Sequence, residues 1–127
     1  IGPAAYKLGT ARRQVKSQGE VKPLSRKPVV RMAELEIAPE TLETYRALLA
    51  EEIEASVALE DGVLSLCAVS IRDHPNRIRI LEVYTDQAAY EAHLQAPHFL
   101  KYKNQTAGMV RSLALIEVDP IAMRAKP

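Results

Sequence analysis

The chain has 127 residues, 47% of them hydrophobic, and a formal net charge of +1 at pH 7. This length and composition are typical of one globular domain and exclude a disordered protein. The small net charge and the lack of a long apolar run give no indication of a nucleic-acid or membrane partner. The single cysteine, Cys67, excludes a disulfide within the chain. Its apolar neighbours predict a small, buried side chain.

Charge is distributed unevenly along the chain. Residues 1–28 hold seven basic side chains and one acidic one, whereas residues 29–127 hold ten basic and fifteen acidic side chains. We therefore expect a basic N-terminal arm over 1–28, a folded domain over 29–118 and a polar C-terminal tail over 119–127. The chain begins at Ile1 and not at Met. A cytoplasmic protein and one exported after loss of an N-terminal segment therefore both stay open.

The first half of the folded region predicts a strand, a helix and a second strand. The alternating residues Val29–Ile37 are typical of a strand. Pro39 suits the first position of a helix. An apolar stripe follows at helical spacing: Leu42, Tyr45, Leu49, Ile53 and Val57. Val63–Ile71 is almost wholly apolar or small, which predicts a strand buried on both faces.

The second half predicts a strand, two helical segments and a last strand. Residues 73–76 are typical of a turn, and Arg77–Thr85 follows it as a strand that pairs antiparallel with the second one. Asp86 is a good N-cap for a short helix, and Pro97 begins another helical segment. Arg111–Val118 predicts the final strand.

This order of elements, β-α-β-β-α-β, is that of the split βαβ, ferredoxin-like plan. We therefore expect an α+β fold with a four-stranded antiparallel sheet and helices on one of its faces. Neither the second nor the last strand has a purely polar side. The sheet face away from the helices must therefore be buried against another surface. A homodimer whose sheets pack face to face would supply that surface.

Most candidate site groups fall between the third strand and the helix after Pro97. Strand alternation places Glu82 and Tyr84 on one face, and helical spacing places Tyr90 and His93 on one side of the next helix. The stretch therefore predicts a carboxylate, phenols and an imidazole beside an apolar surface. In such surroundings water is scarce and pKa values can be tuned.

This stretch resembles the hallmark segment of the antibiotic biosynthesis monooxygenase (ABM) domain in the following residues: Glu82-x-Tyr84, Ala89-Tyr90, His93 and Pro97-His98-Phe99. The likeness extends over about residues 29–118, and the order of elements agrees. Among the members of this family, the stretch is similar to small quinol monooxygenase-like proteins and autoinducer-2 processing isomerases. The isomerases share a Glu-x-Tyr, a His and a Pro-His arrangement.

The resemblance implies a dimeric α+β barrel with a pocket between sheet and helices in each protomer. Members of the monooxygenase type use no metal, flavin or haem. Their substrate, a quinol or polycyclic phenol, is deprotonated, and the electron-rich anion reacts directly with O2. The implied partners are therefore a small aromatic substrate, O2 and a second copy of the chain.

The resemblance also implies roles for individual residues. His93 suits the base, and Glu82 would orient it or a water molecule. Phe99 would stack on a substrate ring, and His98 either lines the pocket or braces the helix that Pro97 begins. Three phenols would donate hydrogen bonds to the substrate oxygen: Tyr84, Tyr90 and Tyr102.

The sequence leaves two other classes of function open. One is an isomerase, or another non-redox acid/base enzyme, acting on a small polar substrate, phosphorylated or not. It would need cationic or polar groups in the pocket, which Arg31, Arg79 and Lys103 would supply if they point inward. A non-catalytic dimeric ligand-binding module would instead have Glu82 and His93 hydrogen-bonded to each other, with no void beside them.

A metal site is also conceivable by ligand type. His93, His98 and Glu82 all carry groups that bind transition metals. Their spacing, however, matches no familiar metal-binding signature. From this spacing we expect no metal, and the resemblance implies no other cofactor.

Overall fold

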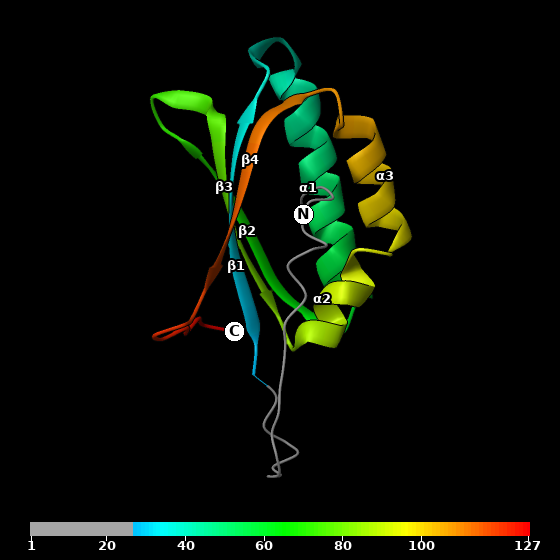
Figure 1. Ribbon diagram of the computed structural model, residues 1–127, viewed down its shortest axis with the longest axis vertical. Coiled ribbons are helices and arrows are strands. Elements are labelled where there is room, and N and C mark those ends of the chain that lie inside the picture. The colour runs from blue at the N-terminus through cyan, green and yellow to red at the C-terminus, as the bar shows by residue number, and fades with distance from the viewer. Residues whose placement is uncertain (1–26) are drawn as a thin grey trace.

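The computed structural model describes residues 27–127 and shows an α+β fold. The basic arm expected over 1–28 lies almost wholly outside the described residues. In chain order the elements are β1 (Val29–Ile37), the 3₁₀ turn η2 (Pro39–Thr41), α1 (Leu42–Leu59), β2 (Val63–Ile71), β3 (His74–Tyr84), α2 (Gln87–His93), α3 (Pro97–Thr106) and β4 (Val110–Val118). Figure 1 shows the sheet nearly edge-on, with the three α-helices together on one side of it.

The sheet has the strand order β2-β3-β1-β4, and all of its pairs are antiparallel. The predicted ferredoxin-like topology is therefore confirmed. On the helix side, Ala33 of β1 lies between Ile80 of β3 and Leu115 of β4. Ala33 and Ile80 are fully buried, with Leu115 packed against them in the main core. The two central strands therefore hold the layer on which the helices pack.

Local signals account for most of the helix boundaries. The side chain of Asp86 accepts a hydrogen bond of 2.9 Å from the backbone N–H of Ala89, which confirms the predicted N-cap of α2. Pro97 begins α3 as expected, whereas Pro39 begins a 3₁₀ turn that leads into α1. β3 begins at His74, three residues earlier than predicted, because the β2–β3 turn is tighter than the turn-forming residues suggested.

The apolar stripe predicted for α1 is correct only in its first half. Tyr45 and Leu49 are buried as expected, but Val57 is 44% exposed. The buried positions in the second half are Glu52 and Ser56, at 2% and 0% exposure. These four buried positions follow the helical period, so α1 turns a polar face towards the protein interior near its C-terminus.

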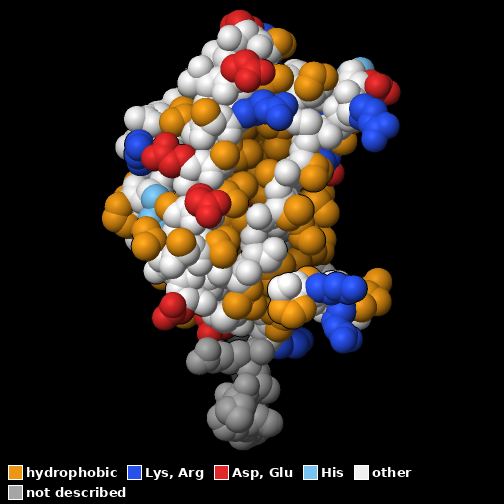
Figure 2. All heavy atoms as spheres, turned by 180° about the vertical axis from the view of Figure 1, so that it is seen from behind, with side chains coloured by type: hydrophobic (Ala, Val, Ile, Leu, Met, Phe, Trp, Pro, Cys, Tyr) orange, Lys and Arg blue, Asp and Glu red, His pale blue; other side chains and the backbone are white. Residues whose placement is uncertain are grey.

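Part of the sheet face opposite the helices carries apolar side chains that are exposed or partly exposed in the single chain. We call this the apolar outer face, and it comprises Met32, Cys67, Val69, Leu81 and Ile116. The strand register sets four of these side chains in one row across the sheet, since Met32 lies opposite Leu81 and Ile116, and Leu81 lies opposite Cys67. Figure 2 shows hydrophobic side chains gathered over this side of the molecule.

Two sequence predictions differ from this arrangement. β2 is not buried on both faces in the single chain, since Val69 is 54% exposed. Cys67 is exposed and not buried, because the strand register points it away from the helices. Among residues 27–127, no helix combines the length and the apolar character needed to cross a membrane.

Gly62, in the turn between α1 and β2, should be intolerant of a side chain. A Cβ atom at this position would overlap the Cβ of Ala89 on α2 and crowd the hydroxyl of Thr85. Because the Cβ of Ala89 is fixed to a helix, α2 would have to move. We expect Gly62→Ala to lower the free energy of unfolding by about 1–3 kcal/mol, as measured by urea unfolding.

Gly108→Ala is the matched control, since no atom of the described chain lies within 4 Å of a Cβ added there. Its effect should stay within about 0.5 kcal/mol. Equal losses in the two variants would contradict a steric limit at Gly62.

Candidate active site

His93 is the last residue of α2, and its side chain is fully buried. Its Nδ1 lies 3.0 Å from Oε2 of Glu60, the residue that caps the C-terminus of α1. Its Nε2 has no hydrogen-bond partner in the described part of the chain, and lies 3.6 Å from Oε2 of Glu52. A carboxylate only accepts hydrogen bonds, so Glu60 holds the proton on Nδ1 and leaves the lone pair on Nε2.

Burial controls the ionisation of the two groups around Nε2. Desolvation lowers the pKa of His93, although the hydrogen bond to Glu60 acts in the opposite direction. Desolvation also raises the pKa of Glu52, against the effect of the Ser56 hydroxyl, which donates a 2.5 Å hydrogen bond to it. His93 is therefore a neutral imidazole near pH 7, the form that can accept a proton.

Glu60 also contacts the second candidate histidine. Nε2 of His98, near the start of α3, lies 2.5 Å from the same Oε2 of Glu60. The side chains of Glu60 and His98 are 15% and 16% exposed, so both reach the surface beside the buried His93. One carboxylate thus joins the two histidines.

Glu82 on β3 is fully buried and interacts with Tyr84. The Tyr84 hydroxyl donates a 2.7 Å hydrogen bond to Oε1 of Glu82. Burial, and then the nearby Glu82 carboxylate, raise the pKa of Tyr84 well above its usual value, so this phenol remains a donor. The hydrogen bond between His93 and Glu82 that the ligand-binding interpretation required is therefore replaced by a bond from His93 to Glu60.

Tyr90 forms the opposite end of the cluster, against Arg31 of β1. The Arg31 guanidinium lies 4.1 Å from the centre of the Tyr90 ring, and its Nη1 lies 3.2 Å from Oε2 of Glu117. Within residues 27–127 the Tyr90 hydroxyl has no hydrogen-bond partner. Burial raises the pKa of Tyr90 to about 12 despite the nearby Arg31. This phenol is thus a protonated donor with no acceptor among the described groups.

Aromatic rings connect these polar groups into one row. The ring of Tyr84 lies 5.1 Å from Tyr90 and 5.4 Å from His93, measured between centroids. Phe99 continues the row at 5.0 Å from His93 and 6.1 Å from Tyr102. All of these rings are buried, so the row crosses the layer between sheet and helices.

Tyr102, at the end of this row, forms a hydrogen bond with another phenol. Its hydroxyl lies 2.7 Å from the hydroxyl of Tyr45 on α1. Burial raises the pKa of Tyr45 to about 12 and also raises that of Tyr102. The two phenols therefore pair with each other, and neither hydroxyl is directed at a ligand in this conformation.

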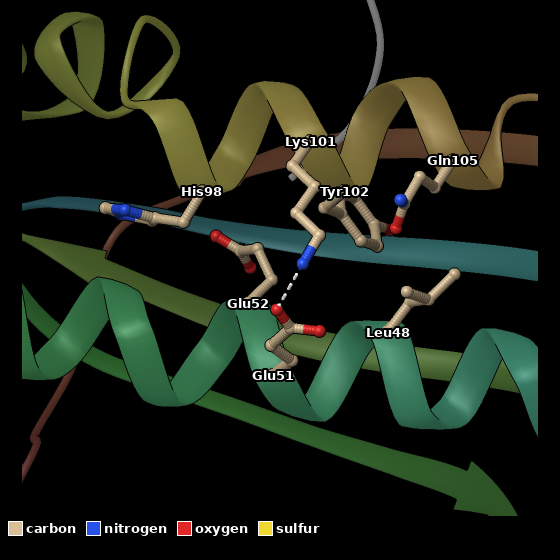
Figure 3. A pocket seen from close by; sticks show the side chains of 7 residues that line it. All are labelled: Leu48, Glu51, Glu52, His98, Lys101, Tyr102 and Gln105. Carbon is tan, nitrogen blue, oxygen red and sulfur yellow. Dashed lines mark hydrogen bonds and ion pairs between the residues drawn. The ribbon is translucent and has the colours of Figure 1, made fainter.

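One hollow that the described residues form beside the cluster is small. A hollow of about 10 Å³ lies between α1 and α3 and is lined by Leu48, Glu51, Glu52, His98, Lys101, Tyr102 and Gln105 (Figure 3). Such a volume holds about one water molecule and not an aromatic ring. A larger hollow of about 270 Å³ lies on the outer side of the sheet among the charged side chains Glu34, Arg77 and Arg79, so it belongs to the outer surface.

All seven residues predicted for the site join one connected cluster, in which Glu60 links His98 to His93 and Phe99 links Tyr102 to His93. The sequence interpretation missed Glu52, Ser56 and Glu60. Their spacing of four residues along α1 was the available signal, because it puts three polar groups on one helix face.

The comparisons with known proteins agree with the fold. The sequence model described as antibiotic biosynthesis monooxygenase matches residues 28–105. No curated protein matches the chain. A solved structure from Bacteroides thetaiotaomicron, provisionally named an antibiotic biosynthesis monooxygenase, is 48% identical; the match covers 80% of this chain and 96% of that one, with a TM-score of 0.76.

Two further solved structures resemble the chain less closely. A protein of Mycobacterium tuberculosis is 26% identical over 78% of this chain and 100% of its own, with a TM-score of 0.69. A protein of Lactobacillus acidophilus, provisionally named a monooxygenase, is 28% identical over 73% of this chain and 44% of its own, with a TM-score of 0.71. The family match over residues 28–105, the 48% identity and the shared fold lead to one conclusion: the chain belongs to the antibiotic biosynthesis monooxygenase family.

Proposed function

We propose that the protein is a monooxygenase that deprotonates a quinol or polycyclic phenol and lets the resulting anion react with O2, without a metal, flavin or haem. Membership of the family and the names of the solved relatives support oxygenase chemistry. One observation carries the deprotonation step. The buried imidazole of His93 is fixed by Glu60 through Nδ1, and its Nε2 has no partner among the described residues.

The reaction balances with the substrate as the only reductant. His93 Nε2 takes the proton of a phenolic hydroxyl, and the anion transfers electrons to O2. A ring C–H bond is replaced by a C–O bond, and the second oxygen atom leaves as water. A quinol that supplies all four electrons ends as a hydroxyquinone, so no external reductant is needed.

The surrounding residues then have distinct roles. Glu60 stabilises the imidazolium that forms on His93, as a carboxylate does in a catalytic triad. The Tyr90 hydroxyl donates to the substrate oxyanion, and Phe99 stacks on its ring. Glu82 acts by holding the Tyr84 hydroxyl in place, so Tyr84 contributes an ordered ring and no donor to the substrate.

A second copy of the chain would cover the apolar outer face. The row from Cys67 through Leu81 and Met32 to Ile116 supports this, because it exposes one apolar side chain on every strand. An exposed surface of this kind is typical of an interface. Two sheets packed face to face would give the dimeric barrel that the resemblance implies.

The second candidate function is the non-redox isomerase. Arg31 favours it, because this cation is only 6% exposed, is near Tyr90 and has an Nε without a hydrogen-bond partner in the described range. An anionic substrate group would satisfy that atom. Arg79, by contrast, pairs with Glu34 at 3.6 Å on the outer side of the sheet. The oxygen-uptake experiment described below distinguishes the isomerase from the monooxygenase.

His93→Asn should abolish most oxygen consumption. We expect saturable O2 uptake by the wild type with a panel of hydroquinones in metal-free buffer. The kcat/KM of the variant should fall by about 10²-fold or more, because it lacks the base. Isotope-labelled O2 should place one labelled oxygen in the product. Circular dichroism confirms that the variant is folded.

His74→Asn is the matched control, since His74 is exposed at the start of β3, and its rate should equal that of the wild type. Unchanged uptake in His93→Asn would refute His93 as the base. If the wild type consumes no O2 with any member of the panel, the isomerase or the ligand-binding module is favoured instead.

Tyr84→Phe and Tyr90→Phe should differ in what they damage. Tyr84→Phe removes the donor to buried Glu82 and should lower the free energy of unfolding by about 1–3 kcal/mol. Tyr90→Phe removes a hydroxyl that has no partner among the described residues, so stability should be unchanged or slightly raised. Its kcat/KM should nevertheless fall about 10-fold or more, as measured by urea unfolding and oxygen uptake. A destabilised but fully active Tyr90→Phe would contradict this assignment.

Leu81→Lys should convert a dimer into monomers. The substitution places a charge at the centre of the apolar outer face, where a second sheet would desolvate it. Light scattering at micromolar concentration should give a dimer for the wild type and a monomer for the variant. Leu59→Lys, at an exposed position that ends α1, should remain dimeric. A monomeric wild type would refute the dimer.

A further inference from the structure

Two histidines and a carboxylate converge where the three α-helices meet. The possible ligand atoms of Glu60, His93 and His98 all lie within 4.8 Å of one another. Glu60 caps the C-terminus of α1, His93 is the last residue of α2, and His98 is in the first turn of α3. Each donor is therefore fixed by the end of a different helix.

We propose that Glu60, His93 and His98 form a binding site for a divalent transition-metal ion of the Zn²⁺ type. The ligands are a carboxylate oxygen of Glu60, Nδ1 of His93 and Nε2 of His98. Two imidazoles and one carboxylate suit the borderline-soft ions of the first transition series. Three protein ligands also leave a coordination position for water or a small ligand.

This proposal replaces the expectation of no metal drawn from the sequence. That expectation paired the histidines with Glu82, whereas the structure brings Glu60 to them. Glu60 precedes His93 by 33 residues and His98 by 38 residues. No local spacing signature connects residues so far apart, so only the fold could reveal this donor set.

The separation of the donor atoms is close to what an ion needs. Oε2 of Glu60 lies 3.0 Å from Nδ1 of His93 and 2.5 Å from Nε2 of His98. Bonds of about 2.0–2.1 Å in a tetrahedral site place ligand atoms about 3.3 Å apart. The two nitrogens therefore need to move away from Oε2 of Glu60 by less than about 1 Å. The nitrogens themselves lie within 4.8 Å of each other and need to be about 3.3 Å apart. Glu60 and His98 are partly exposed and can make this movement, while the buried His93 holds its position.

Two buried atoms near the site support the proposal independently. Nε2 of His93 and Oε1 of Glu52 both lack a hydrogen-bond partner among residues 27–127, and Nε2 faces the Glu52 carboxylate, with Oε2 at 3.6 Å. A metal on Nδ1 requires the proton of His93 to be on Nε2, where it points at this carboxylate. That arrangement, in which a carboxylate orients a metal-bound histidine, is common in zinc proteins. With the ion bound, Nε2 of His93 would therefore carry a proton directed at the Glu52 carboxylate.

The metal-bound and metal-free chains differ in the tautomer of His93. An ion on Nδ1 leaves Nε2 protonated, so Nε2 has no lone pair with which to accept a substrate proton. The proposed deprotonation therefore belongs to the metal-free chain. The metal site rests on the positions of its three donors and not on the proposed function.

Isothermal titration with Zn²⁺ tests the site without reference to any activity. The probe is Zn²⁺ alone, added to the full chain after metal removal and without a histidine tag. All proteins carry Cys67→Ser, because the exposed thiol of Cys67 is a competing ligand. We expect binding of one ion per chain in the parent and an affinity at least about 10-fold lower in His98→Ala.

His74→Ala is the matched control, since it removes an exposed histidine outside the cluster, and it should bind Zn²⁺ as the parent does. Glu60→Gln should also weaken binding, and His98→Ala, at the partly exposed ligand, provides the result if Glu60→Gln fails to fold. Substitution with Co²⁺ should give visible absorption bands in the parent and not in His98→Ala. The proposal is overturned if the parent shows no saturable binding or if His98→Ala binds as tightly as the parent.

Discussion

The carboxylate of Glu60 is the contact on which the candidate site depends. It joins the C-terminus of α1 to His93 of α2 and His98 of α3, and so fixes how three helices meet over the sheet. It also decides which nitrogen of His93 carries a proton. Without Glu60 the buried imidazole would lose its hydrogen bond, at a cost of about 1–3 kcal/mol. The proposed base would lose its orienting group, and the proposed metal site would lose one of its ligands.

The cluster is polar in a layer that is otherwise apolar. Ala33 and Ile80 show what packing alone requires there, since both are fully buried hydrophobic residues. Glu52 and Glu82 are buried as completely, although removing a carboxylate from water is costly unless it is well bonded. Such groups weaken the core and are typical of functional sites. The candidate site therefore lies in the part of the core where buried carboxylates lower the local stability.

The candidate site and the apolar outer face lie on opposite faces of the sheet. The helix side carries Glu82 and Tyr84 at the end of β3, while the other side carries the apolar outer face. Because side chains alternate along a strand, β3 presents Glu82 to the helices and Leu81 to the outer surface. A second copy packed on Leu81 would stiffen the strand that holds Glu82, so the proposed dimer would support the site without contacting His93.

The sequence by itself determined the order of the elements, the N-cap at Asp86 and the grouping of the candidate residues between Glu82 and Tyr102. Those features follow from local periodicity and capping, which act over a few residues. It did not determine that Glu60 contacts His93, that α1 buries Glu52, or that Cys67 is exposed. Only the tertiary structure decided these, because they depend on how helices pack across the sheet and on strand register, and both join residues far apart in the chain.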